Sequence, residues 1–398
     1  MIVTPISLPL VHGVAELEPT RRGMRPHRLP VWVREQFPDP QLLSVESQPS
    51  GVRLVFDSTA ERIEVVVHPT RSQYRGVFRP RGRIDVFIDG EGVVSDELTG
   101  GDVLEVDLQT GTTALHDGPP HTTSLVDLPT GAKRFEVWLP HNESLELVQV
   151  RSDAALLPVV SAGPVWMHHG SSISHGSNAT APSQIWPAVA AWAGGVELLN
   201  LGFGGSAMVD PFLARVMRDT PADVISVKLG INVVNVDAMR LRAFVPAVHG
   251  FLDTIRDGHP ETPLVLISPI FCGIHENTAG PGAFDPAAFA DGQVRFVATG
   301  APGDASQGRL TLTVIRNALE TLLERRSADP NLYYLDGTEL FGETDAAALP
   351  LPDGLHPGPE AHQLIGERFA AFAFSPAGPF AEVIRRRTGA EFGTAALA

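Results

Sequence analysis

Residues 165–176 read Val-Trp-Met-His-His-Gly-Ser-Ser-Ile-Ser-His-Gly, and this stretch decides the fold class. Its first three residues, 165–167, form a short apolar run that is typical of a buried strand. Gly170 ends the run, and two serines follow where a helix can begin. A strand that leads directly into a helix is the repeating unit of a parallel sheet covered by helices.

The same alternation of strand and helix continues toward the C-terminus. Further apolar runs predict strands at 198–201, 224–227, 264–267 and 332–335. Helical spacing is clearest at 186–193, 241–256, 310–326 and 359–372. The pattern predicts an α/β domain with a mostly parallel sheet covered on both faces. In such domains the functional residues lie beyond the carboxyl ends of the strands.

The part of the chain that precedes residue 165 follows a different pattern, because its apolar and polar residues alternate with period two. The clearest runs are 52–56, 63–67, 84–88, 135–139 and 145–150. This alternation, with turn residues between the runs, predicts an antiparallel β-sandwich. We therefore expect a sandwich domain at 1–158, an α/β domain at 159–375 and a tail with a short helix at 376–398.

Composition excludes several classes of function. The 398 residues are 43% hydrophobic and 19% charged, as in ordinary globular proteins, and the net charge of −16 makes nucleic acid and anionic membranes poor partners. No apolar run approaches the roughly 18–20 residues of a membrane span. The start of the chain is not a convincing signal peptide, and the single cysteine, Cys272, requires no oxidising compartment. We expect a cytoplasmic protein.

Three segments that follow successive strands carry candidate residues. Ser172 follows the first strand, where it can face a substrate, although taken alone it is better explained as a helix N-cap. The segment 202–207 is rich in glycine, which lets backbone N–H groups approach a ligand, but it also fits a degenerate dinucleotide fingerprint. Asn232 can donate its amide to a developing negative charge or simply form a turn.

A fourth segment, 353–358, precedes the last long helix and reads Asp-Gly-Leu-His-Pro-Gly. Asp353 can accept a hydrogen bond from one nitrogen of His356, which leaves the other nitrogen to act as a general base. Metal binding by the three histidines at 168, 169 and 175 is a weaker alternative, because the zinc motif HExxH and a cysteine cluster are absent. We expect neither a metal nor another cofactor.

Ser, Gly, Asn and His occur in this order along the chain, and in this order and spacing they resemble the SGNH (GDSL) hydrolase family. The four blocks of that family match residues 170–173, 202–205, 230–232 and 353–356. The resemblance covers residues 165–372 and implies a flavodoxin-like α/β/α domain.

The resemblance also implies a role for each block. Ser172 would be the nucleophile, His356 the general base and acid, and Asp353 the group that orients His356. The backbone N–H groups of Ser172 and Gly205 and the side-chain amide of Asn232 would hold the oxyanion. The expected activity is hydrolysis of a small-molecule acyl ester through an acyl-serine.

Two positions depart from the family pattern, and they leave the support of the nucleophile turn open. Ser171 stands where the family usually has Asp, and Val233 stands where Asp is common. A sandwich joined to a domain with this serine block is similar to a subgroup that includes a salicylyl acyltransferase of a tetracycline pathway. Its N-terminal domain is similar to carbohydrate-binding jelly rolls. Acyl transfer to an alcohol of a polyketide or sugar is therefore the first alternative.

A further alternative is a carbohydrate-binding protein whose catalytic half is inactive. Trp138, Phe87 and Tyr74 could stack on sugars, although Trp138 and Phe87 are better explained as core residues of the sandwich. The segment 273–308 is rich in Gly, Pro and Ala, and it either covers the substrate or is a passive insertion.

Overall fold

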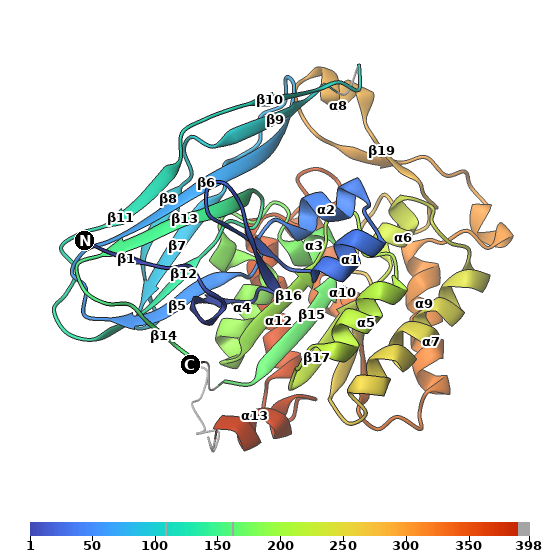
Figure 1. Cartoon of the computed structure of the whole chain (residues 1–398). Helices are drawn as coiled ribbons and strands as arrows, with labels where there is room; N and C mark the ends of the chain where they lie inside the picture. The colour runs from blue at the N-terminus through green and yellow to red at the C-terminus, as the bar shows by residue number, and fades with distance from the viewer. Residues whose placement is uncertain (108–109, 161–162, 389–398) are drawn as a thin grey trace.

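The computed structural model describes residues 1–107, 110–160 and 163–388, which form an α/β domain beside a strand-rich sandwich (Figure 1). Five parallel strands make the central sheet: β15 (Val165–Gly170), β16 (Glu197–Gly202), β17 (Val224–Lys228), β18 (Leu264–Ile267) and β21 (Leu332–Leu335). Their spatial order is β16-β15-β17-β18-β21. The next two strands along the chain, β16 and β17, therefore lie on opposite sides of β15. In parallel sheets, ligands usually bind at the carboxyl ends of the strands at such a point.

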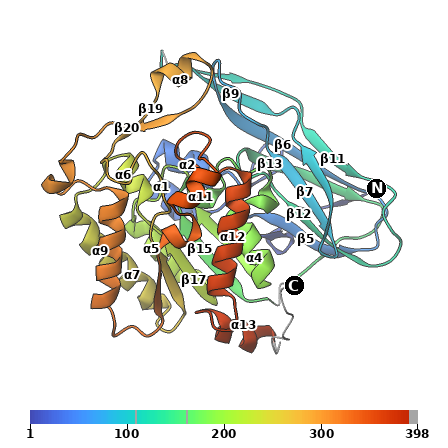
Figure 2. The same ribbon diagram turned by 180° about the vertical axis from the view of Figure 1, so that it is seen from behind.

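Helices cover both faces of this sheet, as the sequence predicts (Figures 1 and 2). On one face lie α5 (Pro211–Asp219), α7 (Leu241–Gly258) and α9 (Leu312–Arg325). On the other face lie α4 (Trp186–Gly194) and α12 (Pro359–Ala373). The strands are buried on both faces because successive side chains point to opposite sides, so Ile225 and Val227 join one core and Val224 joins the other. The expected α/β/α domain is confirmed.

Two sheets form the sandwich. The larger contains, in order, β10 (Thr113–His116), β9 (Asp102–Val106), β6 (Ile63–Tyr74), β13 (Ser144–Ser152), β4 (Met24–His27) and β3 (Glu16–Pro19), with β1 (Ile2–Thr4) beside β13 and β11 (His121–Leu125) beside β6. The smaller contains, in order, β14 (Leu157–Pro158), β5 (Arg53–Ser58), β12 (Lys133–Trp138), β7 (Arg83–Ile88) and β8 (Glu91–Glu97), with β2 (Val11–His12) beside β5.

One strand pair departs from the expected antiparallel arrangement, because β6 and β9 are parallel. The two strands between them, β7 and β8, form an antiparallel pair in the other sheet. The chain therefore leaves the larger sheet after β6, makes this hairpin in the smaller sheet, and returns in its original direction.

The first 50 residues contain two short helices that no sequence pattern predicted, α1 (Val31–Gln36) and α2 (Pro40–Glu46). Val33, Leu42 and Val45 of these helices are buried in the core that also contains α5 and α7. This segment lies within the range predicted for the sandwich domain, yet its apolar side chains pack on the α/β domain.

Trp138 and Phe87 lie at the junction between the sandwich and the α/β domain. Phe135 and Val137 of β12 point into the sandwich, so the alternation of the strand turns Trp138 outward. Its ring lies 6.4 Å from that of Trp192 on α4, and the ring of Phe87 lies 5.0 Å from Trp192. The expectation that these two residues fill the sandwich core is wrong, because they pack against α4.

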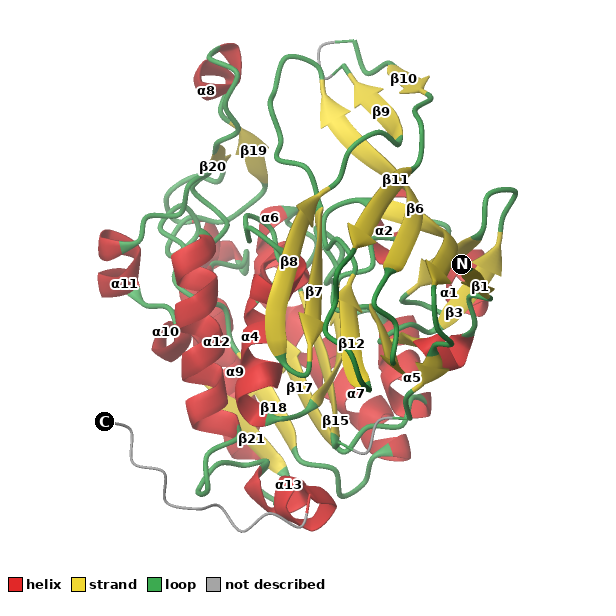
Figure 3. Cartoon of the chain, turned by 90° about the vertical axis from the view of Figure 1, so that its left-hand side faces the viewer, coloured by secondary structure: helices red, strands yellow, loops and turns green. Residues whose placement is uncertain are grey.

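The segment 273–308 contains a small hairpin, formed by β19 (Gly282–Phe284) and β20 (Phe296–Ala298) with α8 (Pro286–Ala290) between them. Figure 3 shows this hairpin standing out from the α/β domain on the side where the sandwich strands end. We call residues 282–298 the arch.

The remaining helices are short or lie near the end of the chain. They are η1 (Leu8–Leu10), α3 (Ser172–His175), η2 (Pro182–Gln184), α6 (Ile231–Asn235), η3 (Asp304–Gln307), α10 (Gly337–Leu340), α11 (Glu343–Ala348) and α13 (Ala381–Thr388). The helix expected in the tail is α13, and residues 389–398 of the tail lie outside the described part of the chain. Among the described helices, none is both long and apolar enough to span a bilayer.

Candidate active site

The turn after β15 places Ser172 at the first position of α3. Ser171 is the N-cap of this helix, and its hydroxyl accepts a hydrogen bond from the N–H of Ile173 at 3.4 Å. The capping role considered for Ser172 thus belongs to its neighbour. The hydroxyl of Ser172 is therefore left to interact with groups outside the turn. The residue itself is largely buried, with 8% of its surface exposed.

Ser172 meets the histidine and aspartate of the fourth segment, although His356 is 184 residues away in the sequence. The Oγ of Ser172 lies 2.9 Å from Nε2 of His356, and Nδ1 of His356 lies 2.7 Å from Oδ2 of Asp353. When Nδ1 donates to the carboxylate, Nε2 is the acceptor for the serine hydroxyl. The three groups therefore form a continuous path for a proton from serine to histidine.

The Asp353 carboxylate is held firmly by its own turn. Its Oδ1 accepts backbone hydrogen bonds from Leu355 at 3.0 Å and from His356 at 2.7 Å. Burial acts to raise the pKa of Asp353, but the hydrogen bonds and the charge of His356 outweigh it and hold that pKa below its usual value. The carboxylate is ionised at neutral pH and can stabilise a protonated imidazole.

The three donors expected to hold an oxyanion lie in the segments that directly follow β15, β16 and β17. They are the backbone N–H groups of Ser172 and Gly205, for which no acceptor exists among the described residues, and Nδ2 of Asn232. Oδ1 of Asn232 accepts from the N–H of Ala207 at 3.1 Å, which fixes the amide so that Nδ2 remains as the donor. Backbone N–H groups and side-chain amides of this kind can stabilise negative charge on a substrate oxygen.

Glycine is required at two positions for these segments to approach each other. A Cβ on Gly202 would lie 2.5 Å from the backbone nitrogen of His175, so only glycine lets β16 pass this close to α3. Gly205 has a φ of +70°, which glycine adopts without strain. A Cβ on Gly204 would lie 3.8 Å from that of Ser172, which places the loop 202–205 beside the serine.

Two of the three histidines weighed as metal ligands, His168 and His175, use both ring nitrogens in other contacts, whereas Nε2 of the buried His169 has no hydrogen-bond partner in the described part of the chain. His168 bridges Ser226 and Ser174 with distances of 2.7 Å to each hydroxyl oxygen, and Nδ1 of His169 lies 2.7 Å from the carbonyl oxygen of Leu201. His168 contacts Ser174 and so connects β15 to α3, which supports the turn that carries Ser172. At position 171 in this turn, the family usually has Asp, and this chain has Ser171. In the described ranges no group of three or more His, Cys, Asp or Glu residues could hold a metal ion.

Cys272 lies directly behind the fourth segment but is not available as a nucleophile. It is buried, and its Sγ lies 3.5 Å from the carbonyl oxygen of Gly354. Burial raises the pKa of this thiol to about 12, so it stays protonated at neutral pH.

Two residues near the site have no signature in the sequence. The ring of Phe296, in the arch, packs edge-on against the His356 ring at 5.6 Å, and its N–H donates to the carbonyl oxygen of Asp353 at 2.8 Å. Gln41 of α2 donates from Nε2 to the carbonyl oxygen of Gly204 at 2.9 Å. A lone aromatic residue in a loop and a lone glutamine on a helix follow no fixed spacing, so no pattern could have marked them.

The arch extends from the turn that carries Asp353 and His356 to the sandwich. Phe296 contacts Phe284 with ring centres 5.1 Å apart, and Phe284 contacts Tyr74 at the end of β6 with ring centres 6.1 Å apart. The arch thus connects the two domains next to His356, and Tyr74 lies in this contact.

Comparison with known proteins agrees with the fold. Residues 169–364 match the model of the GDSL-like lipase/acylhydrolase family. The solved structure of the salicylyl-acyltransferase SsfX3 from a tetracycline biosynthetic pathway is similar, with 26% identity, a TM-score of 0.76, and coverage of 92% of this chain and 94% of that one.

More distant structures share the fold. A protein from Bacteroides ovatus ATCC 8483 described as a GDSL-like lipase has 19% identity and a TM-score of 0.63, with coverage of 90% of this chain and 93% of that one. A family two carbohydrate esterase from Clostridium thermocellum has 16% identity and a TM-score of 0.52, with coverage of 81% of this chain and 91% of that one. No curated protein matches the sequence.

Proposed function

The chain belongs, through residues 169–364, to the GDSL-like lipase/acylhydrolase family, and we propose that it is a serine-dependent esterase that acts through an acyl-serine intermediate. The observation that carries this proposal is the path from Ser172 through His356 to Asp353, with distances of 2.9 and 2.7 Å. A serine hydroxyl is a weak nucleophile unless an adjacent base removes its proton, and this path supplies that base.

In the first half of the reaction, Nε2 of His356 takes the hydroxyl proton while Oγ of Ser172 bonds to the acyl carbon. The carbonyl oxygen becomes negatively charged, and the N–H groups of Ser172 and Gly205 and Nδ2 of Asn232 stabilise it. When the tetrahedral intermediate collapses, the bond to the alcohol breaks, and His356 returns its proton to the leaving oxygen.

In the second half, a water molecule attacks the acyl-serine. His356 accepts a proton from the water, the same three donors stabilise the new oxyanion, and Ser172 leaves with the proton from His356. The products are a carboxylic acid and the free enzyme. Asp353 keeps the imidazole oriented and stabilises its positive charge in both halves.

Acyl transfer is the second candidate, because another alcohol can replace water in the second half. Two observations favour it. The similar salicylyl-acyltransferase aligns with both domains of this chain. The arch places Phe296 against His356, and an apolar cover over the base disfavours attack by water. Product analysis with an acyl donor, with and without polyol or polyketide acceptors, separates the two reactions. If only the free acid ever forms, transfer is excluded.

The experiment that tests the proposal is the substitution Ser172→Ala, assayed with p-nitrophenyl acetate. We expect kcat/KM to fall at least about a thousand-fold, because loss of the nucleophile leaves only binding and oxyanion stabilisation. His356→Ala should cause a comparable loss, and Asp353→Ala a smaller one, because water or a backbone carbonyl can partly orient the ring. Ser177→Ala, which removes a hydroxyl from the next turn, should keep wild-type activity. Undiminished turnover in Ser172→Ala would exclude the mechanism.

A further inference from the structure

Gln41 connects the N-terminal segment to the loop that follows β16. Its side chain is exposed on α2, and its Nε2 donates to the carbonyl oxygen of Gly204 at 2.9 Å. A Cβ on Gly205 would lie 3.2 Å from the same nitrogen, so the glutamine amide packs directly on the peptide that joins the two glycines.

That peptide also carries the N–H of Gly205, one of the three donors proposed to hold the oxyanion. In a planar trans peptide, the carbonyl and the N–H point in opposite directions. A hydrogen bond that fixes the carbonyl oxygen of Gly204 therefore also fixes the direction of the Gly205 N–H. Within the described part of the chain, Gln41 makes the one hydrogen bond to this peptide.

The peptide needs such a bond because it lies between two glycines. Glycine has wide backbone freedom, and with Gly205 at a φ of +70° this peptide can rotate at little steric cost. The start of the loop is held differently, since Nη1 of the buried Arg28 donates to the carbonyl oxygen of Gly202 at 2.7 Å. Arg28 does not reach the peptide between Gly204 and Gly205.

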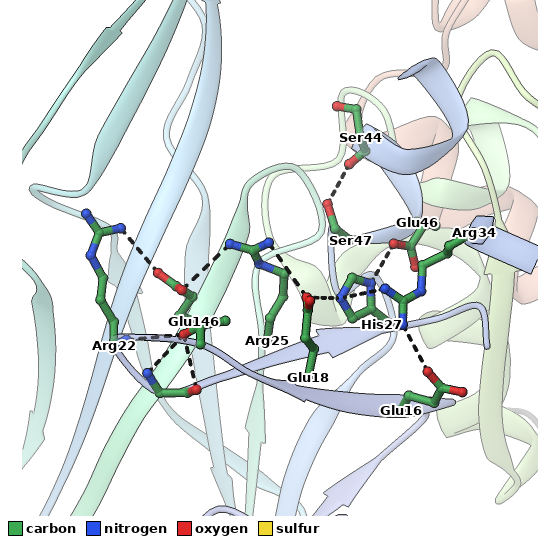
Figure 4. A network of polar contacts seen from close by, with 12 residues as sticks. Glu16, Glu18, Arg22, Arg25, His27, Arg34, Ser44, Glu46, Ser47 and Glu146 are labelled. Atoms are coloured by element: carbon green, nitrogen blue, oxygen red, sulfur yellow. Dashed lines mark hydrogen bonds and ion pairs between the residues drawn. The ribbon is translucent and has the colours of Figure 1, made fainter. Parts of the chain in front are cut away.

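The segment that carries Gln41 is itself held in place by polar contacts. Figure 4 shows His27 between Glu18 and Glu46, and Arg34 beside Glu16. Nδ1 of His27 lies 2.6 Å from Oε1 of the buried Glu46, the last residue of α2, and Nε2 lies 2.9 Å from Oε2 of Glu18. These contacts fix α2 to the hairpin of β3 and β4.

The start of α2 and its buried face are also held in place by side chains. The carboxylate of Asp39 caps α2 by accepting from the N–H of Leu42 at 2.8 Å. Leu42 and Val45 are buried in the core of the α/β domain. Gln41 therefore extends from a helix whose position is fixed at both ends.

We propose that Gln41 is a positioning residue that holds the N–H of Gly205 toward the reacting oxygen, so that residues 28–46 form part of the active site. This inference rests on the proposed function, because it needs the Gly205 N–H to act as an oxyanion donor. It assigns a role to the N-terminal segment that no residue pattern in that segment indicates.

The test is Gln41→Met, which keeps the length of the side chain but cannot donate a hydrogen bond. We expect kcat for p-nitrophenyl acetate to fall about ten-fold with KM nearly unchanged, a smaller loss than the removal of a whole oxyanion donor. The Ki of a trifluoromethyl ketone, which forms a tetrahedral adduct with the serine, should rise by about the same factor. The melting temperature should stay the same because Gln41 is exposed.

Gln36→Met is the matched control, because Gln36 is exposed on α1 and its side chain accepts from Arg215 at 2.8 Å, away from the loop. This variant should keep the wild-type kcat and Ki. Gln41→Lys restores a long donor and should recover most of the lost kcat, whereas Gln41→Glu, which has no donor, should not.

The outcomes separate this inference from the proposed function. If Ser172→Ala is as active as the wild type, both fail. If activity depends on Ser172 but Gln41→Met keeps the wild-type kcat and Ki, the positioning role alone is wrong. Equal losses of kcat in Gln41→Met and Gln41→Lys would also overturn it, because the effect would then not depend on a donor.

Discussion

At the scale of single residues, Asn232 is the proposed oxyanion donor whose orientation is best determined. Its Oδ1 is bound to the N–H of Ala207, and the residue is 3% exposed. We expect Asn232→Ala to lower kcat by about a hundred-fold to a thousand-fold with a small change in KM, as when an oxyanion donor is removed. Steady-state kinetics with p-nitrophenyl acetate checks this. A rise in KM with kcat unchanged would instead show that Asn232 binds the ground state of the substrate.

The residues of the site differ in whether their place in the fold can be predicted from the sequence. Ser172, Asn232 and His356 stand directly after strands or in a turn fixed by glycine and proline, so their position in the fold could be predicted. Gln41 and Phe296 reach the site from segments with no regular pattern. Their contacts depend on how α2 and the arch pack against the domain, and this tertiary packing has no local signature in the sequence.

At the scale of elements, we propose that the arch influences whether water or another acceptor attacks the acyl-serine. Phe296 packs against His356, and Phe284 connects it to Tyr74 of the sandwich. We expect Phe296→Ala to admit water and to lower the ratio of acyl transfer to hydrolysis when an alcohol such as glycerol competes. Quantifying the ester and the acid by chromatography measures this ratio. An unchanged or higher ratio would contradict the covering role.

Most regular elements of the α/β domain were predicted from their periodicity. The five strands of the parallel sheet and the four long helices lie close to the predicted ranges, because each buries a continuous apolar face. The helices α1 and α2 have only six and seven residues and were missed, and α5 was missed although it has nine residues. The parallel pairing of β6 with β9 was also missed, because pairing depends on the path of the chain between the sheets and not on either strand alone.

For the whole molecule, buried histidines predict the response of stability to acid. Burial lowers the pKa of His141 to about 3 and those of His169 and His362 to about 4, and it also lowers the pKa values of His168 and His175. These groups stay neutral in the folded state, whereas in the unfolded chain they bind protons below about pH 6.5. The contribution of these histidines to the free energy of unfolding is therefore fully present above about pH 6.5 and is lost as the pH falls toward 4.

We expect the free energy of unfolding to fall over this range by up to about 1.4 kcal/mol per pH unit for each such histidine. Urea denaturation at pH 7, 6 and 5 measures the slope. His169→Phe should reduce the slope by about one proton, because the ring already packs against Phe203 and Phe251. The exposed His116 is the control, and His116→Phe should leave the slope unchanged. A flat profile between pH 7 and 5 would contradict the account.

We propose above that His356 activates the hydroxyl of Ser172 as a nucleophile. The most direct measurement is labelling of the wild-type protein with a fluorophosphonate, followed by peptide mass spectrometry. We predict one adduct, on the peptide that contains Ser172, and its loss in His356→Ala, because labelling requires the serine to be deprotonated. An unlabelled protein, or an adduct on a residue other than Ser172, would contradict the claim.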